Sequence, residues 1–351
     1  MKIAVLSSFP PRKCGIAHLT KNLFDEWRAQ GHQLVTFGID VSECDYKINT
    51  NSFSGLLEVA SIIKREKIEH VSVQFIIGFY GKKYFGLNFL LFLWALRKKR
   101  VIVTLHELHH IRSFGQIFRK PLDLFHITLE VLISCFSTGV ILHTEAQVSD
   151  LKRYGIRDVR CVYLGIQTKS VPRTRTALSQ ALFFGKLVPF KGAHLFSGIA
   201  RVCPEVHFVL ACSVEPQYEA YRLQLVRDFE GIPNIEFVCR DWIGNEEKEA
   251  CFTAADVLVL PYIDTYYQSG VASESGVYNI PVIVPKLGPL SEITLKYHVG
   301  EAVEQVDAAS IKTAIHKIFG NYPHYLEGIQ KYRAEANWSV AARNYLEYLR
   351  G

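Results

Sequence analysis

The sequence lacks the motifs that mark several common classes of protein. None of its eight cysteines forms a C-x-x-C pair, so neither a zinc ribbon nor a thioredoxin-like redox site is indicated. No G-x-G-x-x-G follows the first strand-like run, and no G-x-x-x-x-G-K-[ST] occurs, which argues against the NAD fingerprint and the P-loop. A clear Asp-x-Asp pair, low-complexity tracts and internal repeats are also missing.

Long hydrophobic runs are scarce as well. The run Lys2–Leu6 is too short for an export signal and predicts a first buried strand. The longest apolar run, Phe85–Leu96, is shorter than the roughly 20 residues that cross a bilayer. We interpret it as a core helix that ends in the basic residues Arg97–Arg100, with a membrane-facing patch as the alternative. We therefore expect a cytoplasmic protein and leave peripheral contact with the inner face of the membrane open.

The excess of positive over negative charge is small. The net charge of +6 favours anionic partners such as phosphates or acidic lipid headgroups. It is too dispersed to predict nucleic-acid binding, and no nucleic-acid motif accompanies it. We expect the cysteines to be small buried hydrophobic residues in a reducing compartment, with a disulfide or zinc role as the alternative.

Strand-like and helix-like segments alternate along the 351 residues, a length that suits two domains. The strand-like runs are continuous in Val, Ile, Leu and Phe, which predicts parallel sheets covered on both faces. A polar stretch at 168–179 interrupts the alternation and is interpreted as the interdomain linker. The strands expected before it are Ile3–Ser7, Gln33–Gly38, His70–Phe75, Val101–Leu105, Gly139–His143 and Arg160–Leu164. Those expected after it are Leu182–Phe184, His207–Cys212, Ile235–Val238, Val257–Leu260 and Val282–Val284.

This pattern predicts an α/β protein with two successive Rossmann-like domains and a cleft between them. Because ligands of such sheets bind outside the carboxyl ends of the strands, the segments that follow strands deserve most weight. The first such segment contains Gly15, where a small residue lets backbone N–H groups approach an anion at a helix N-terminus. A plain tight turn is the alternative there.

The second segment contains the H-E-x-x-H pattern of zinc peptidases, with His106, Glu107 and His110. That site needs both histidines on one helix, whereas an apolar strand precedes His106 directly. Glu130 could serve as a third ligand, so the metal interpretation stays open. A strand-end histidine facing the cleft is the preferred interpretation.

The third segment runs from Gly185 and Lys186 to Lys191 and Gly192. Two lysines and the N-terminus of a helix expected over Ala193–Arg201 suit a diphosphate. Two solvated lysines around a turn are the alternative.

The fourth segment joins a strand that ends near Pro261 to a helix expected over Ser269–Tyr278. Glu274 lies about one turn into that helix, where it can accept hydrogen bonds from ribose hydroxyls. An ordinary glutamate favoured by the helix dipole is the alternative.

Taken together, these segments resemble the GT-B glycosyltransferases of family 4, over nearly the whole chain. The first loop, Phe9 to Ala17, resembles that of a subgroup, and Thr104–Glu107 resembles the family's strand-end histidine segment. The loop Phe184–Gly192 is similar to the G-R-x(4)-K-G diphosphate loop, with Lys186 in the arginine position. Ala254–Pro261, and Glu274 with the Pro281–Ile283 run, resemble the C-terminal signature.

The departures from the family concern the donor site. The E-x(7)-E pair keeps only its second member, Glu274, because Tyr266 stands in the first position. Gln268, Ser269 and Gly270 replace the usual Phe-Gly turn, and Leu164 replaces a frequent histidine. Lysine at position 186 keeps the charge of arginine but loses its bidentate geometry.

The resemblance implies a retaining hexosyltransferase that uses a GDP- or UDP-sugar without a bound metal or other cofactor. Lys186 and Lys191 would stabilise the departing diphosphate, and Glu274 would hold the ribose. His106 would contact the donor sugar, and Gly15 would lie near phosphate and acceptor. Backbone N–H groups near the donor sugar would come from the turn made by Gln268, Ser269, Gly270 and Val271; Gly185 and Gly192 would line the diphosphate loop.

The resemblance also implies domains at residues 1–167 and 168–351, with a last helix at about 338–351 crossing back to the first domain. The acceptor would be a glycan, a lipid-linked glycan or a small molecule. The competing hypotheses are a non-catalytic nucleotide-sugar-binding protein, suggested by the lost first glutamate, and the zinc peptidase.

Overall fold

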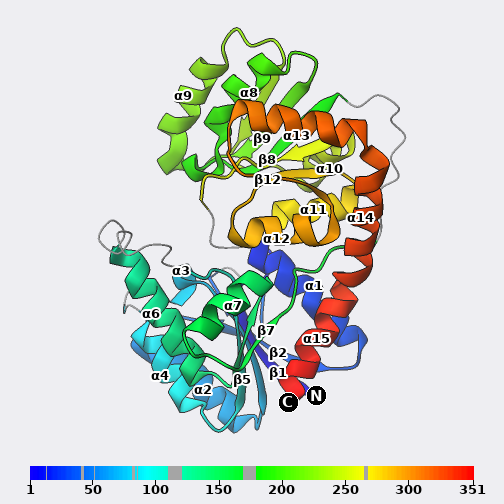
Figure 1. Cartoon of the computed structure of the whole chain (residues 1–351). Coiled ribbons are helices and arrows are strands. Elements are labelled where there is room, and N and C mark those ends of the chain that lie inside the picture. The colour runs from blue at the N-terminus through cyan, green and yellow to red at the C-terminus, as the bar shows by residue number, and fades with distance from the viewer. Residues whose placement is uncertain are drawn as a thin grey trace. The chain divides into compact units, whose positions relative to one another are not determined.

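The computed structural model describes residues 1–12, 14–40, 43–50, 52–80, 84, 86–109, 121–168, 179–264 and 268–351, with only the backbone of 121–123. The chain forms two compact units. Unit 1 comprises Met1–Gly165 and Trp338–Gly351, and unit 2 comprises Ile166–Asn337. Each unit is a parallel sheet with helices on both faces (Figure 1), as the continuous apolar strands predict.

The sheet of unit 1 has seven strands in the order β3-β2-β1-β4-β5-β6-β7, all parallel. The strands are β1 (Lys2–Ser7), β2 (Gln33–Ile39), β3 (Tyr46–Ile48), β4 (His70–Phe75), β5 (Arg100–Leu105), β6 (Gly139–Leu142) and β7 (Val159–Cys161). The helices are α1 (Gly15–Ala29), α2 (Phe53–Arg65), α3 (Ile77–Tyr80), α4 (Leu87–Ala95), α6 (Pro121–Phe136), α7 (Glu145–Arg153) and α15 (Trp338–Arg350).

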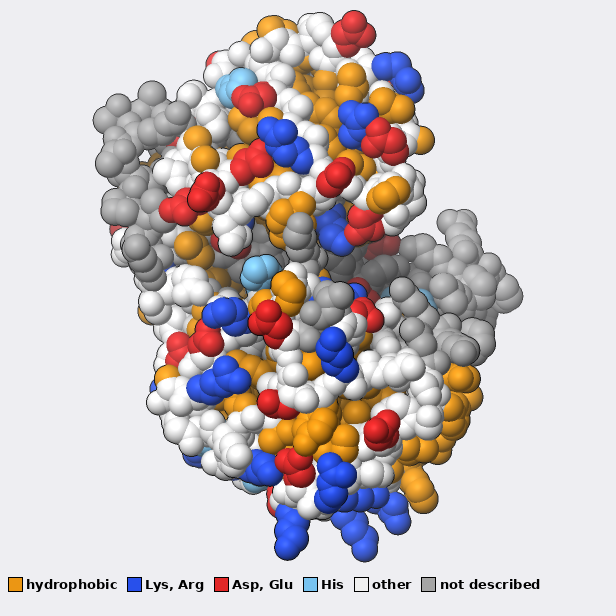
Figure 2. All heavy atoms as spheres, turned by 180° about the vertical axis from the view of Figure 1, so that it is seen from behind, with side chains coloured by type: hydrophobic (Ala, Val, Ile, Leu, Met, Phe, Trp, Pro, Cys, Tyr) orange, Lys and Arg blue, Asp and Glu red, His pale blue; other side chains and the backbone are white. Residues whose placement is uncertain are grey.

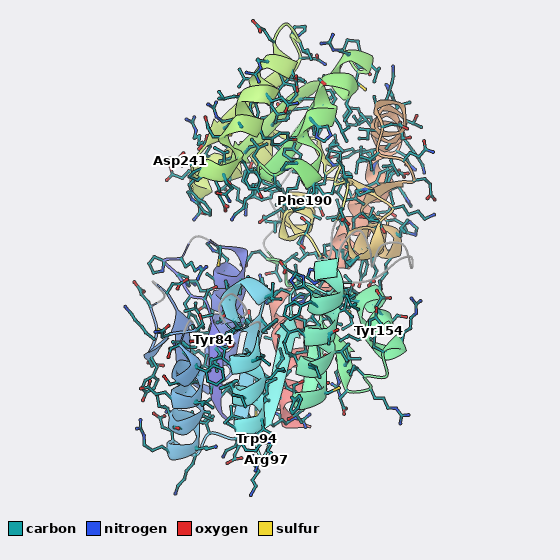
Figure 3. All side chains as sticks on the ribbon, turned by 90° about the vertical axis from the view of Figure 1, so that its left-hand side faces the viewer. Tyr84, Trp94, Arg97, Tyr154, Phe190 and Asp241 are labelled. Carbon is teal, nitrogen blue, oxygen red and sulfur yellow. The ribbon has the colours of Figure 1, made fainter. Side chains whose placement is uncertain are left out.

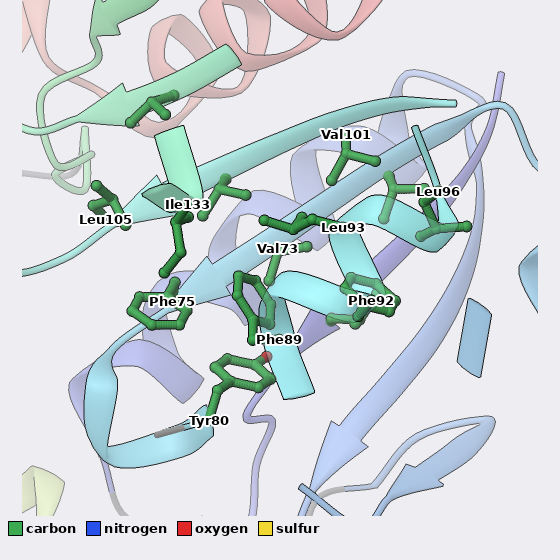
Figure 4. Close-up of a cluster of buried hydrophobic side chains, with 14 of the residues drawn as sticks. Val73, Phe75, Tyr80, Phe89, Phe92, Leu93, Leu96, Val101, Leu105 and Ile133 are labelled. Atoms are coloured by element: carbon green, nitrogen blue, oxygen red, sulfur yellow. The ribbon is translucent and has the colours of Figure 1, made fainter. Parts of the chain in front are cut away.

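Two hydrophobic clusters cover the two faces of this sheet because successive residues of a strand point to opposite sides. On β1, Ala4 and Leu6 join the cluster beneath α2 and α4, whereas Ile3 and Val5 join the one beneath α1 and α15. Figure 4 shows the first cluster, in which aromatic side chains of β4, α3 and α4 pack together. The rings of Phe75 and Tyr80 stack with centroids 5.5 Å apart.

The last helix of the chain, α15, belongs to unit 1. Trp27 on α1 donates its indole N–H to the carbonyl of Ala342 over 3.1 Å. Arg100 at the start of β5 donates two hydrogen bonds to the carbonyl of Tyr348. These bonds and the apolar contacts of Tyr345 and Leu346 cover the face of the sheet that α1 leaves free.

Unit 2 has six parallel strands in the order β10-β9-β8-β11-β12-β13. The strands are β8 (Gln180–Lys186), β9 (His207–Ser213), β10 (Ile235–Arg240), β11 (Val257–Val259), β12 (Val282–Pro285) and β13 (Gly300–Val303). The helices are α8 (Phe196–Val202), α9 (Glu219–Phe229), α10 (Asn245–Ala254), α11 (Gly270–Tyr278), α12 (Gly288–Tyr297), α13 (Ala308–Gly320) and α14 (Tyr322–Glu335), and three 3₁₀ turns are η1 (Pro189–Lys191), η2 (Ala193–Leu195) and η3 (Pro216–Tyr218).

The sequence-based expectations hold for most elements and miss a few. The short β3 and α3, and the pair α12 and β13, were not expected. The strand expected over Arg160–Leu164 is only the three residues Val159–Cys161. Residues 169–178 of the expected linker lie outside the described part of the chain.

Candidate functional site

In each unit the strand order reverses at one point, which is where ligands of open parallel sheets bind. In unit 2 this point lies between β8 and β11, and in unit 1 between β1 and β4. The β8 strand ends at Gly185 and Lys186, and Pro261 and Tyr262 follow β11. The third and fourth segments singled out from the sequence therefore meet at the switch point of unit 2.

Lys191 is the cation at this point. Its side chain is almost fully buried, with 9% of the residue exposed. The ammonium lies 5.3 Å from the centroid of the Tyr262 ring, within range of a cation–π interaction. Among the described residues no carboxylate forms an ion pair with it. A buried ammonium without an anion is costly, so this environment favours an anionic ligand.

Gly185 makes room for the Lys191 ammonium. A Cβ at this position would lie 3.1 Å from Nζ of Lys191 and 3.6 Å from a methyl group of Val271. Its φ of +130° is also a conformation that other residues rarely adopt. The end of β8, the η1 turn and the start of α11 thus converge on one small volume.

Gly192 corrects one expectation. We expected an α-helix from Ala193 whose N-terminus would stand behind the lysine loop, but Ala193–Leu195 form a 3₁₀ turn and the α-helix begins only at Phe196. Gly192 itself is closely packed, since a Cβ there would meet the carbonyl oxygen of Pro261 at 2.0 Å, and its φ of +75° places it in the left-handed region before the 3₁₀ turn. The loop therefore contributes its lysine and tight backbone, without an α-helix terminus at Gly192.

Lys186 differs from Lys191 in both exposure and pairing. Its side chain is 54% exposed, and its ammonium donates to the Glu215 carboxylate over 2.5 Å. This contact lowers the pKa of Glu215. The two lysines of the expected diphosphate pair are thus unequal, because only Lys191 lacks a carboxylate partner among the described residues.

The N-terminus of α11 lies beside Lys191. Ser269 caps this nine-residue helix by accepting a hydrogen bond from the N–H of Ala272, and its hydroxyl lies 3.5 Å from that of Tyr262. Gln268 and Ser269 are buried, whereas Gly270 is exposed. Tyr262 thus connects the lysine to the cap of the helix, where backbone N–H groups of Gly270 and Val271 lack intrahelical acceptors.

Glu274 has a partner that the sequence did not indicate. Its carboxylate forms an ion pair with the ammonium of Lys248 on α10. The Glu274 side chain is 23% exposed and that of Lys248 is 30% exposed, so ligands can reach both. No motif places Lys248, because its pairing depends on how α10 and α11 pack over the sheet.

In unit 1, Gly15 is the first residue of α1, directly after the N-cap Cys14. The Cys14 thiol accepts from the N–H of Ala17 over 3.4 Å and contacts the Ser8 hydroxyl at 3.2 Å. Among the described residues, no atom lies within 4 Å of a Cβ built on Gly15, so this side of the helix start is open. The expected loop-to-helix transition after β1 is therefore present.

His106 follows β5 directly, as expected, and is part of a hydrogen-bonded network of side chains. Its Nδ1 lies 3.2 Å from Nε2 of His143, whose Nδ1 lies 2.9 Å from the carbonyl of Val162. A carbonyl only accepts, so His143 carries its proton on Nδ1 and accepts from His106. Oε1 of the Gln74 amide lies 2.8 Å from Nε2 of His106. Because a neutral His106 that donates through Nδ1 can only accept at Nε2, Gln74 pairs with it when the NH₂ group of its amide is turned toward the ring.

Burial dominates the titration of this pair. It lowers the pKa of His143 to about 4 and, together with His143, lowers that of His106 well below its usual value. Both rings are therefore neutral near pH 7. Since both nitrogens of His106 already have protein partners, a contact with a sugar requires Gln74 or His143 to move.

The H-E-x-x-H segment is not helical over residues 106–109, and His110 lies outside the described residues. Glu130, considered as a third metal ligand, instead accepts two hydrogen bonds from His109, one at 2.7 Å from Nδ1 and one at 3.0 Å from the backbone. Burial raises the pKa of Glu130 to about 7. Within the described residues, no group of three or more His, Cys, Asp or Glu is placed to hold a metal ion.

All eight cysteines are free thiols. Only Cys203 and Cys212 are buried, and Cys135 is exposed, so the expectation of buried cysteines holds for two of them. The other five are partly buried: Cys14 caps α1, Cys44 lies between β2 and β3, Cys161 and Cys239 lie near strand ends, and Cys251 lies in α10. No helix in the described part of the chain is long and apolar enough to cross a membrane.

No protein-family model and no curated protein matches the sequence. Solved structures do match over the whole chain. The sucrose-phosphate synthase of Thermosynechococcus elongatus is 18% identical, with a TM-score of 0.75 over 100% of this chain and 98% of that one. Anabaena Alr3699/HepE in complex with UDP is 14% identical, with a TM-score of 0.77 over all of both chains.

A third match is the trehalose-6-phosphate synthase OtsA, which is 12% identical with a TM-score of 0.71 over 100% of this chain and 99% of that one. At these identities the likeness shows the fold. The chain has the two-domain α/β fold of these GT-B glycosyltransferases, as the sequence predicted.

Proposed function

We propose that the protein is a glycosyltransferase that takes a sugar from a nucleotide-diphosphate donor bound at the switch point of unit 2. The observation that carries the proposal is Lys191, a buried ammonium without a carboxylate partner among the described residues, placed between the ends of β8 and β11. A diphosphate supplies the missing negative charge. The fold shared with Anabaena Alr3699/HepE, which was solved in complex with UDP and with UDP-glucose, supports the same assignment.

A UDP-sugar is the preferred donor, with a GDP-sugar as the alternative. HepE was solved with UDP and with UDP-glucose, and trehalose-6-phosphate synthase with UDP-2-fluoro glucose. In our proposal the ribose hydroxyls donate to Glu274, which Lys248 orients through their ion pair. The open N-terminus of α11 offers the N–H groups of Gly270 and Val271 to the donor sugar.

The proposed reaction retains the anomeric configuration and needs no metal or other cofactor. The bond between the anomeric carbon and the diphosphate oxygen breaks, and its electron pair leaves with the nucleotide diphosphate. The acceptor hydroxyl attacks on the same face and gives its proton to the departing phosphate. Lys191 stabilises the negative charge that grows on that oxygen, the type of contribution that usually dominates such catalysis.

Lys186 and Gly15 have secondary roles in this proposal. The Lys186 side chain is 54% exposed, so its ammonium can exchange the Glu215 carboxylate for a phosphate. Gly15 leaves the first turn of α1 open to a phosphate or to the acceptor. His106 contributes to sugar recognition through the hydrogen-bonded chain with Gln74 and His143. The acceptor is a hydroxyl of a glycan, of a lipid-linked glycan or of a small molecule.

A thermal-shift series with UDP, GDP and ADP tests the donor assignment. We expect UDP to raise the melting temperature most, since a ligand at 100 times its Kd adds about 2.7 kcal/mol of stability. UDP-glucose with purified protein is then assayed for release of UDP. Binding of UDP without any sugar release or transfer indicates the competing hypothesis, a non-catalytic nucleotide-sugar-binding protein. No response to any nucleoside diphosphate contradicts both.

A further inference from the structure

Three helices of unit 1 carry exposed apolar side chains that together form a broad surface. α4 is apolar on all sides: Phe89, Phe92 and Leu93 face the core, whereas Leu87 and Trp94 are 57% and 53% exposed. A helix of this composition is normally buried on every side. Its outer face is therefore unusual for a protein surface that meets only water.

Neighbouring helices extend this surface. Side chains of α2, α4 and α6 line an open groove of about 440 Å³, which we call the α4 groove. Its lining residues are Phe53, Leu87, Leu90, Leu91, Trp94 and Phe136. Figure 2 shows hydrophobic side chains gathered along this flank of unit 1, on the lower right of the view. The lining is thus continuous across three elements.

One end of the α4 groove is basic. Both α2 and α4 end at the edge of the sheet where the strands begin, because each leads directly into a parallel strand. Lys64 lies in the last turn of α2 and Lys67 follows that helix, whereas Arg97 and Lys98 follow α4, and all four are exposed. Figure 3 shows Trp94 and Arg97 together at this end.

The four exposed basic residues at this end have no acidic partner in the part of the chain that the structure describes. The nearby carboxylate of Glu69 pairs with Lys99, and that of Glu66 pairs with Lys2. Among the described residues no ion pair involves Lys64, Lys67, Arg97 or Lys98. The Arg97 guanidinium instead lies 4.4 Å from the centroid of the Trp94 ring. An apolar surface and uncompensated positive charge therefore share one face.

We propose that the α4 groove and its basic end form a docking surface for a membrane that carries anionic lipids. Tryptophan, leucine and phenylalanine side chains enter the boundary between headgroups and acyl chains, while lysine and arginine contact anionic headgroups. Arg97 fits this geometry because its apolar stem and the Trp94 ring share one surface while its charge stays at the rim. A second copy of the chain is a less suitable partner for this surface, because it would bring the same basic residues and no complementary negative charge.

Co-sedimentation of the full chain with lipid vesicles tests the proposal. We expect binding to vesicles of phosphatidylcholine mixed with phosphatidylglycerol, little binding to phosphatidylcholine alone, and weaker binding at high salt. Lys98→Gln should weaken binding about fivefold, because one basic residue near an anionic surface contributes about 1 kcal/mol. Trp94→Glu should weaken it further. Leu295→Glu is the matched control, because Leu295 is a similarly exposed apolar residue of unit 2, at 48%. This variant should bind the vesicles as wild type does.

Circular dichroism and melting temperatures of the variants exclude unfolding, which is not expected because Trp94 is 53% exposed. Trp94→Phe supplies a second readout: it should keep vesicle binding and remove the blue shift of tryptophan emission that wild type shows with mixed vesicles. Three outcomes overturn the proposal. They are absence of binding to mixed vesicles, binding that Trp94→Glu leaves unchanged, and a concentration-dependent dimer in solution that Trp94→Glu dissociates.

Discussion

The Lys191 ammonium and the Tyr262 ring lie 5.3 Å apart at the point where the strand order of unit 2 reverses. The lysine comes from the turn after β8 and the tyrosine from the segment after β11. The ring holds the cation by its face and, through its hydroxyl, reaches the cap of α11 at Ser269. One buried cation and one open helix terminus are thus prepared for the same anionic ligand.

Gly185→Ala should displace Lys191 and destabilise unit 2. The new methyl group would meet Nζ of Lys191 at 3.1 Å, and the φ of +130° is strained for alanine. We expect a loss of roughly 1–3 kcal/mol of unfolding free energy and weaker UDP binding. Gly320→Ala is the control, because nothing lies within 4 Å of its Cβ. Urea denaturation and UDP titration check both variants, and wild-type UDP affinity in folded Gly185→Ala contradicts the assigned role of this glycine.

Glu274→Gln should weaken binding of the preferred nucleotide while leaving the fold intact. A hydrogen bond to a charged acceptor contributes about 1.5–3 kcal/mol, so we expect a loss of about 10- to 150-fold in affinity. Isothermal titration with the nucleotide and with its 2′-deoxy analogue measures the effect. The discrimination between the two ligands should shrink in Glu274→Gln.

Lys248→Met separates the ribose contact from the ion pair that orients it. It removes the partner of Glu274 but keeps the carboxylate. We expect a smaller loss of affinity than in Glu274→Gln, with discrimination against the 2′-deoxy nucleotide retained. Equal losses in both variants show instead that the ion pair, and not a ribose contact, accounts for the effect.

The buried His143 should make the protein less stable in mild acid. Its pKa is about 4 in the folded chain against an ordinary 6.5, so the unfolded chain binds the additional proton as pH falls below 6.5. The stability loss develops between pH 6.5 and about 4 and amounts to the order of 3 kcal/mol. His143→Asn, whose amide can still donate to the Val162 carbonyl, should lose less stability over this range.

Comparing the unfolding curves of wild type and His143→Asn separates the contribution of the His106–His143 pair from that of Glu130. Glu130 has the opposite effect, because its raised pKa of about 7 adds stability as the pH falls through that value. His207→Asn is the control, since the His207 side chain is 45% exposed. Parallel pH profiles of wild type and His143→Asn contradict the assignment.

Much of the fold could be predicted because the buried strands are continuous apolar runs. β4 begins and ends at the predicted residues His70 and Phe75, since its buried residues form one continuous run. The short β3 and α3 carry too few residues for a period to show. The α12 helix was missed because its glycine and proline at the start suggest a turn, although both positions suit a first helical turn.

The sequence indicated where the candidate site lies in the fold, but not how its side chains pair with one another. The motifs placed His106, Lys191 and Glu274 after strands or in the helix that follows, which follows from the topology of parallel sheets. They could not distinguish Lys186 from Lys191, because the difference arises from Glu215 and the depth of the turn. Gln74 and His143 were missed for the same reason: only tertiary packing brings their strand ends beside His106.

Lys186→Ala should have a milder effect on transfer than loss of Lys191. The Lys186 ammonium is exposed and already paired with Glu215, so solvent and salt can replace much of its contribution. We expect a modest rise in KM for the donor and a kcat close to that of wild type. Steady-state kinetics with UDP-glucose measure both constants. A collapse of kcat in Lys186→Ala would mean that Lys186, and not Lys191, provides the main stabilisation of the departing diphosphate.

The turnover of wild type and Lys191→Ala in EDTA tests the central claim most directly. If Lys191 stabilises the departing diphosphate without a metal, wild type should transfer or hydrolyse UDP-glucose at an undiminished rate in EDTA. Lys191→Ala should lower kcat by about 10²–10³, with a smaller effect on donor Kd because the charge grows towards the transition state. Strict dependence on Mg²⁺ or Mn²⁺, or wild-type turnover in Lys191→Ala, contradicts the account.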